Sequence, residues 1–212
     1  MEVTEGVHLI TGVRGCNCYL ITKPELILID TGMPGQAGKV LDYISDLGYS
    51  GRDLKRIVLT HHDVDHIGSA AELQRLTGAE VCMHRADADC VVGRSPRRPF
   101  WKAWLSGLAK VWGQFQPPQI TRFLDNGETV GPLRVIHTPG HSAGSISLCY
   151  GNVLFVGDLL RWAGPLREVP HPAHQDNKLV GASIRKIAEL DFLILCPGHG
   201  KPIFDAAEEL RG

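Results

Sequence analysis

One short stretch, residues 60–68 with the sequence THHDVDHIG, limits what this chain can fold into more than any other. It follows an apolar run at 57–59 that is typical of a buried strand, so its polar side chains gather where that strand ends. Imidazoles and carboxylates crowded in this way would repel one another or stay unpaired without a cation. The stretch therefore indicates a metal site, and the alternative is a polar turn whose His pair caps the next helix.

Three later segments are built in the same way. Each is an apolar strand that runs into a Gly- or Pro-bearing turn carrying a His or an Asp: 133–136 before His141, 153–156 before Asp158, and 192–195 before His199. An α/β protein places its chemistry in such loops because the strands fix the position of the loops. We therefore expect the chemistry of this chain at these strand ends.

With these motifs in order, the chain resembles the metallo-β-lactamase superfamily, whose usual pattern is T-H-x-H-x-D-H followed by a lone His, a lone Asp and a final His. Five matches occur at sensible intervals, from the DTG turn at 30–32 to the PGHG turn at 197–200. The resemblance covers nearly the whole chain. It implies an α/β (α+β) fold in which two mixed β-sheets pack face to face between helices, as an αββα sandwich.

The resemblance also implies a site for two metal ions. The first ion would be held by His61, Asp63 and His141, the second by Asp65, His66 and His199, and Asp158 would bridge the two. The chain departs from the family at Asp63, where most members have His. A carboxylate there still coordinates, but it is harder and adds negative charge, which shifts preference toward iron or manganese. We expect two divalent ions, with zinc as the first choice and iron or manganese as alternatives.

Other histidines lie outside this ligand set. Side-chain alternation predicts that His62 points away from the metals. His137 is interpreted as a residue of a strand end and not as a ligand. His84 also ends a strand and is interpreted as a structural or solvated residue, the alternative being a place at the edge of the pocket, which this strand end sometimes borders in the family. His171 and His174 follow the bridging Asp in a loop that often borders the substrate in the family, so they are interpreted either as substrate contacts or as structural residues.

Apolar periodicity predicts strands in two groups with helices between and after them. Strands are expected at 7–10, 18–21, 26–30, 57–60, 81–84, 130–137, 145–150, 153–158 and 192–195, and helices at 40–47, 69–76 and 177–190. No linker or low-complexity tract interrupts the chain, and 212 residues suffice for one domain with a sizeable core. We therefore expect a single domain over 1–212.

An aromatic-rich segment at 93–118 stands out from this plan. Its large apolar side chains recur at helical spacing from Trp101 to Phe115, and it holds three of the chain's four Trp. Three interpretations stay open: a helix that completes the core, a lid or pocket wall over the metals, and a homodimer interface.

Composition limits the other function classes. Hydrophobic residues make up 43%, charged residues 21%, and the net charge is −1, so no strong field favours nucleic acid or a membrane surface as partner. The six Cys form no C-x-x-C pair, and the N-terminus lacks the basic and apolar regions of an export signal. We expect a cytoplasmic protein whose partner is a small-molecule substrate.

The resemblance implies a metal-dependent hydrolase that uses a metal-bridged hydroxide on an acyl substrate such as a thioester or a lactone. Asp65 is the candidate to orient that hydroxide and to pass a proton to the leaving group. An iron-dependent oxidoreductase of the same fold, similar to persulfide dioxygenases, is the alternative from another class. β-Lactam hydrolysis as a side activity and a binding protein with an inactive site are the remaining alternatives.

Overall fold

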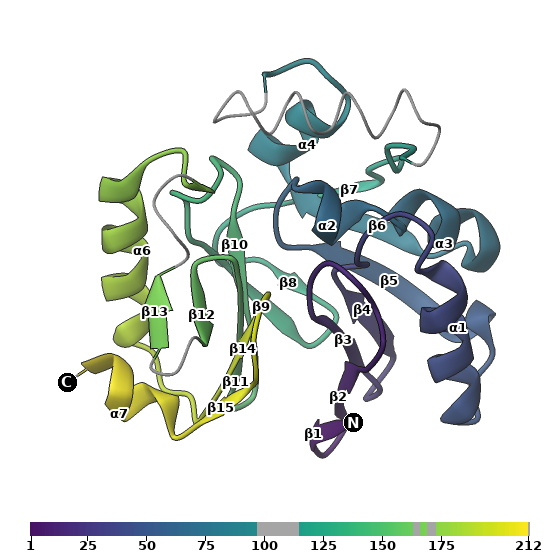
Figure 1. Ribbon diagram of the computed structural model, residues 1–212, viewed down its shortest axis with the longest axis horizontal. Coiled ribbons are helices and arrows are strands. Elements are labelled where there is room, and N and C mark those ends of the chain that lie inside the picture. The colour runs from purple at the N-terminus through teal and green to yellow at the C-terminus, as the bar shows by residue number, and fades with distance from the viewer. Residues whose placement is uncertain (97–114, 163–165, 169–172, 212) are drawn as a thin grey trace.

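The chain forms two β-sheets that pack face to face, with helices on the outer face of each (Figure 1). The computed structural model describes residues 1–96, 115–162, 166–168 and 173–211. This architecture confirms the predicted αββα sandwich of the α/β class. Residues 97–114 of the aromatic-rich segment lie outside the described residues, so its three interpretations and the single-domain assignment remain predictions.

The first sheet combines an antiparallel and a parallel half. Its strands lie in the order of the chain: β1 Glu2–Thr4, β2 Val7–Ile10, β3 Cys18–Ile21, β4 Leu26–Ile29, β5 Leu54–Leu59, β6 Glu80–His84 and β7 Arg122–Leu124. Strands β1 to β4 form an antiparallel meander, and β4 to β7 run parallel to one another. The carboxyl ends of β4, β5 and β6 therefore lie at one edge of the sheet, which is where the 60–68 stretch begins.

The second sheet brings the later motifs to a common edge. Its order is β15 Ile203–Phe204, β14 Ile194–Pro197, β11 Val153–Gly157, β10 Ile146–Tyr150, β9 Leu133–His137 and β8 Thr129–Val130. Strands β11 and β14 are parallel, and β10 is antiparallel to both β9 and β11. The carboxyl ends of β9, β11 and β14 therefore point the same way, and each leads into one of the predicted turns.

Three apolar layers hold the sandwich together. Helices α1 Ala37–Asp46 and α3 Ala70–Thr77 cover the first sheet, and helices α6 Asn177–Ala188 and α7 Ala206–Arg211 cover the second (Figure 1). Between the sheets, the rings of Tyr19 and Phe155 meet edge to face with their centroids 5.2 Å apart. Burial of these layers is the main term that stabilises the fold and fixes the strand ends.

The expected strand at 130–137 is wrong as a single element. The structure divides it into β8 and β9, which pair antiparallel with Val130 opposite Leu133. Gly131 makes this turn possible because its φ of +57° lies in the left-handed region, which most side chains avoid. The apolar pattern alone could not separate a tight hairpin from one longer strand.

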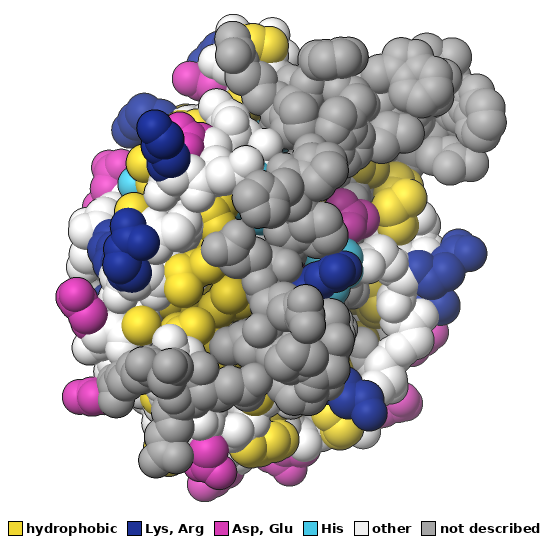
Figure 2. Space-filling model, turned by 60° about the vertical axis from the view of Figure 1, so that its left-hand side comes forward, with side chains coloured by type: hydrophobic (Ala, Val, Ile, Leu, Met, Phe, Trp, Pro, Cys, Tyr) yellow, Lys and Arg dark blue, Asp and Glu magenta, His cyan; other side chains and the backbone are white. Residues whose placement is uncertain are grey.

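Several short elements had no counterpart in the sequence prediction. They are the 3₁₀ turn η1 Gly51–Asp53, helices α2 Val64–Ile67, α4 Arg85–Val91 and α7, the edge strands β1, β7 and β15, and the hairpin of β12 Leu160–Trp162 with β13 Leu166–Glu168. In the part of the chain that the structure describes, no helix is both long and apolar enough to cross a membrane. On the face shown in Figure 2, acidic and basic side chains of the described residues are interspersed, without a dominant patch of one sign.

Candidate metal centre

Backbone hydrogen bonds between the loops assemble the edge where the predicted ligands lie. The Ile146 N–H donates to the Thr60 carbonyl, which joins the second sheet to the first. The Thr31 N–H donates to the carbonyl of His66, and the Gly198 N–H donates to the carbonyl of Gly157. These bonds fix the loops after β4, β5, β11 and β14 relative to one another, so their side chains converge between the two sheets.

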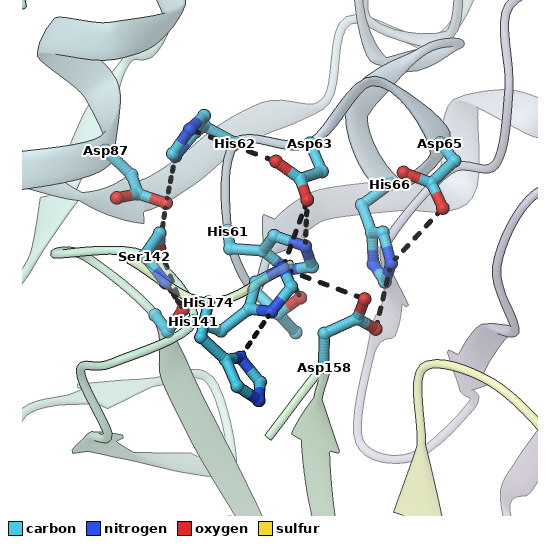
Figure 3. Close-up of polar contacts among 12 residues, drawn as sticks. His61, His62, Asp63, Asp65, His66, Asp87, His141, Ser142, Asp158 and His174 are labelled. Atoms are coloured by element: carbon cyan, nitrogen blue, oxygen red, sulfur yellow. Dashed lines mark hydrogen bonds and ion pairs between the residues drawn. The ribbon is translucent and has the colours of Figure 1, made fainter. Parts of the chain in front are cut away.

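The first cluster consists of His61, Asp63 and His141, whose ligand atoms all lie within 4.8 Å of one another. Oδ2 of Asp63 is 3.1 Å from Nε2 of His141 and 3.6 Å from Nε2 of His61 (Figure 3). Both imidazoles are buried. The three donors come from two loops, one in each sheet, so the cluster exists only when the sandwich is formed.

The second cluster consists of Asp65, His66 and His199, whose ligand atoms also lie within 4.8 Å of one another. Helix α2 carries Asp65 and His66, and the turn after β14 carries His199. Nε2 of His199 is 3.5 Å from Oδ2 of Asp65 and 3.4 Å from Nε2 of His66. This arrangement gives a second set of three donors beside the first.

Asp158 lies between the two clusters. Its Oδ1 is 3.2 Å from Nε2 of His66, and its Oδ2 is 3.8 Å from Nε2 of His141 (Figure 3). The same Oδ1 is 3.3 Å from Nε2 of His199. One carboxylate thus directs one oxygen toward each cluster. The structure brings all seven predicted residues together.

The charges of the site favour a bound cation. Burial alone would raise the pKa of Asp158, but the neighbouring His66, His199 and His141 hold it well below its usual range. Burial lowers the pKa of His61, so its imidazole is neutral, and its buried Nε2 has no hydrogen-bond partner among the described residues. Burial would lower the pKa of His199, but Asp158 and Asp65 raise it to about 9, so this imidazole would release a proton on binding a metal. Neutral imidazoles and ionised carboxylates are the forms that bind divalent metals, and the donor set fits two such ions in exchange for protons.

Asp30 supports the second cluster from behind. It is buried at the end of β4, and its Oδ2 lies 2.8 Å from Nδ1 of His66. The same carboxylate accepts hydrogen bonds from the Thr60 N–H at 2.8 Å and from the Thr60 hydroxyl at 2.7 Å. Such a carboxylate fixes the orientation of a ligating imidazole. The motif at 30–32 indicated a turn but no role for Asp30, although Asp30 ends a strand as the other site residues do.

Asp87 supports the first cluster and was missed by the sequence analysis. Its Oδ2 lies 2.9 Å from Nδ1 of His62 and accepts a 2.7 Å hydrogen bond from the Ser142 hydroxyl. Burial would raise the pKa of Asp87, but His62 and the Ser142 hydroxyl lower it to about 2. His62 therefore directs Nδ1 away from the clusters, as predicted, while its Nε2 is 3.9 Å from Oδ1 of Asp63.

The other histidines have supporting positions. His174 is buried, with its Nδ1 3.2 Å from Nδ1 of His141, so it lies behind a predicted ligand. His84 and His137 stack with their ring centroids 4.2 Å apart, and His84 caps α4 by accepting from the Ala86 N–H. These contacts agree with the structural interpretation of the three residues. His171 lies outside the described residues.

Proteins of known sequence resemble this chain over most of its length. A probable metallo-hydrolase of Bacillus subtilis, YflN, is 32% identical over 95% of this chain and 86% of its own length. A hydroxyacylglutathione hydrolase of Shewanella baltica is 33% identical, but the match covers 62% of this chain and 42% of that protein.

Solved structures share the fold. A metallo-β-lactamase family protein of Thermus thermophilus, TTHA1429, superposes with a TM-score of 0.78 and 26% identity, covering 99% of this chain and 78% of its own. The structure of TTHA1623 in a di-iron-bound form has a TM-score of 0.73 and 28% identity, covering 95% and 96%. The sequence model of the family described as the metallo-beta-lactamase superfamily matches residues 11–199. The chain therefore belongs to the metallo-β-lactamase superfamily, whose members bind divalent metals.

Proposed function

We propose that this protein is a hydrolase that holds two divalent cations and cleaves an acyl bond, such as a thioester or a lactone. The observation that carries the proposal is the position of Asp158, with one carboxylate oxygen beside each three-residue cluster. A carboxylate placed in this way can be a ligand shared by two metals a few ångströms apart. The relatives described as a metallo-hydrolase and a hydroxyacylglutathione hydrolase support the same class of reaction.

The ligand roles follow the two clusters. His61, Asp63 and His141 would hold the first cation, Asp65, His66 and His199 the second, and Asp158 both. Two such cations would supply a water acidified to near neutral pKa and positive charge for a developing oxyanion. The residues contribute by fixing the separation of the clusters and by excluding bulk water from the buried side, which is formed by His61, His66 and His141.

Asp65 is the proposed proton carrier. Its side chain is 34% exposed, so it reaches toward the side from which a substrate arrives. Burial would raise its pKa, but the neighbouring His66 and His199 lower it, so the carboxylate is ionised at neutral pH. An ionised carboxylate beside the nucleophile can accept a proton from water and pass it to a leaving thiolate or alkoxide.

The cations are proposed to be zinc, with iron or manganese as alternatives because Asp63 replaces an imidazole by a harder ligand. The test begins with metal analysis of protein purified without added metal, followed by reloading with zinc, iron or manganese. Each form is then screened against thioesters, lactones and a chromogenic β-lactam. Turnover of a thioester or lactone that is lost on chelation and restored by metal supports the proposal. A fully metallated protein that hydrolyses none of them contradicts it.

An iron-dependent oxidoreductase is a second candidate because two observations favour iron. The first cluster contains the carboxylate of Asp63, and a structure of similar fold is in a di-iron-bound form. This candidate predicts that the purified protein contains iron and consumes oxygen when given a persulfide. Zinc content with no oxygen consumption would eliminate it.

A further inference from the structure

Asp87 is a fully buried carboxylate on helix α4, which lies above the edge where loops of both sheets meet (Figure 1). Its Oδ2 contacts Nδ1 of His62 and the hydroxyl of Ser142 (Figure 3). Its Oδ1 accepts a 2.7 Å hydrogen bond from the Gly144 N–H. Both carboxylate oxygens are thus engaged. A buried ionised carboxylate that accepts three hydrogen bonds fixes the loops that supply the three donors.

The partners of Asp87 are the chain neighbours of two predicted ligands. His62 directly precedes Asp63 in the loop after β5, and Ser142 directly follows His141 in the loop between β9 and β10. Within the first cluster, Oδ2 of Asp63 is 3.1 Å from Nε2 of His141. Asp87 therefore connects the two loops, which belong to different sheets, immediately behind the first cluster.

Helix α4 packs closely against the loop between β9 and β10. A Cβ atom on Gly144 would lie 2.6 Å from the Asp87 backbone nitrogen and 2.7 Å from its Oδ1, which is closer than real contacts allow. The loop is further fixed by the Ser145 hydroxyl, which accepts from the Ser142 N–H at 3.0 Å. A shift of α4 would therefore move the loop and His141 with it.

The second cluster is held by another carboxylate. Nδ1 of its buried His66 is 2.8 Å from Oδ2 of Asp30. The three hydrogen-bond partners of Asp87, in contrast, all lie beside the first cluster. Asp30 also reaches the first cluster, because Oγ1 of Thr60, which donates to Asp30, is 3.0 Å from Nδ1 of His61. Removing Asp87, whose hydrogen-bond partners lie beside the first cluster, should therefore affect the first half more than the second.

We propose that Asp87 is a positioning residue that sets the affinity of the first cluster for its cation and leaves that of the second cluster unchanged. This inference rests on the proposed function, since it requires that both clusters bind a cation. Asp87 acts through His62 and Ser142, which hold the neighbouring Asp63 and His141 in position across the two sheets. Residues of this kind typically change metal affinity by about 10- to 100-fold when they are replaced.

The test compares the wild type with Asp87→Asn. Asn keeps the shape and an oxygen for the Gly144 N–H, but its amide group cannot accept from His62 or Ser142. Metal-free protein is titrated with Co²⁺, with visible absorption reporting each site and native mass spectrometry counting the bound ions. We expect two ions in the wild type. In Asp87→Asn we expect one unchanged affinity and one weakened by about 10- to 100-fold.

Two further variants complete the design. Asp89→Asn is the matched control, because Asp89 lies on the same helix with a side chain that is 44% exposed, and both affinities should equal those of the wild type. Ser142→Ala removes a single bond to Asp87 and should weaken only one ion, by a smaller factor. This variant also tests the inference if Asp87→Asn does not fold, which thermal unfolding would show.

The outcomes separate the inference from the proposed function. A wild type that binds no Co²⁺ overturns both. A wild type with two ions, together with unchanged affinities in Asp87→Asn and Ser142→Ala, overturns only the role of Asp87. Equal weakening of both ions also overturns it, because that result would show a general effect on the fold. Selective weakening of one ion supports it.

Discussion

The two halves of the metal centre differ in how far they face the solvent. In the first cluster, the side chains of His61, Asp63 and His141 are 1%, 14% and 2% exposed. In the second cluster, His66 is fully buried, but the side chains of Asp65 and His199 are each 34% exposed. The first cluster is therefore set deep between the sheets, and the second opens toward the surface.

The residues that support the two halves also lie in different parts of the fold. Asp87 and His174 stand behind the first cluster, one on α4 and the other in the segment before α6. Asp30 stands behind the second, at the end of β4. The first half is therefore supported by helix α4 and the segment before α6, whereas the second half, which is more exposed, is supported by a strand end of the first sheet.

Removing the group that both halves share should have the largest effect. Asp158→Ala should weaken the binding of both cations and lower kcat/KM by more than the roughly 100-fold typical of a supporting residue. The physical reason is that its two oxygens face different clusters. Metal titration and steady-state kinetics measure the effect, with the exposed Asp42→Ala on α1 as control. Loss of only one cation would show that Asp158 does not bridge.

A more selective effect is expected at the second cluster. Asp30→Asn should weaken the second cation more than the first, by about 10- to 100-fold, because it removes the charged acceptor next to Nδ1 of His66 and touches His61 only through the Thr60 hydroxyl. Asn suits this position, where φ is +57°, since it tolerates the left-handed conformation. Competition with a chelator measures both affinities in one experiment. Equal weakening of both cations would erase the distinction between the halves.

A smaller effect is expected behind the first cluster. His174→Phe keeps a ring of similar size but loses the polar contact with Nδ1 of His141, so the first cation should bind about tenfold more weakly. The same chelator competition applies, and His8→Phe serves as the control because His8, on β2, packs against Tyr43 away from the centre. Weakening of the second cation alone would contradict the proposed pairing of support and cluster.

The smallest change in affinity, and a change in metal identity, is expected for Asp63→His. Replacing a carboxylate by an imidazole should leave a folded protein whose metal content moves toward zinc. Elemental analysis of wild type and variant, purified side by side from the same medium, measures the shift. Identical metal content in the two proteins would refute the role assigned to Asp63.

The sequence pattern identified the seven side chains that converge, but it did not identify the residues that support them, for a physical reason. Each donor follows an apolar strand or a recognisable turn, so local pattern identifies it, and parallel pairing brings the strand ends to one edge. Asp30 carried the same local signal and was overlooked. Asp87 carries none, because it lies in a short helix and its partner Ser142 is 55 positions away. The hairpin at Gly131 was missed since a tight turn and a long strand share one apolar pattern.

The position of the cations themselves tests the central claim most directly. A crystal of protein loaded with zinc or iron, measured at the absorption edge of that metal, should show two anomalous peaks, one in each cluster, with Asp158 between them. Such peaks would agree with the arrangement of all seven side chains. A single peak, or peaks remote from Asp158, would contradict the two-cation site on which the proposed hydrolysis depends.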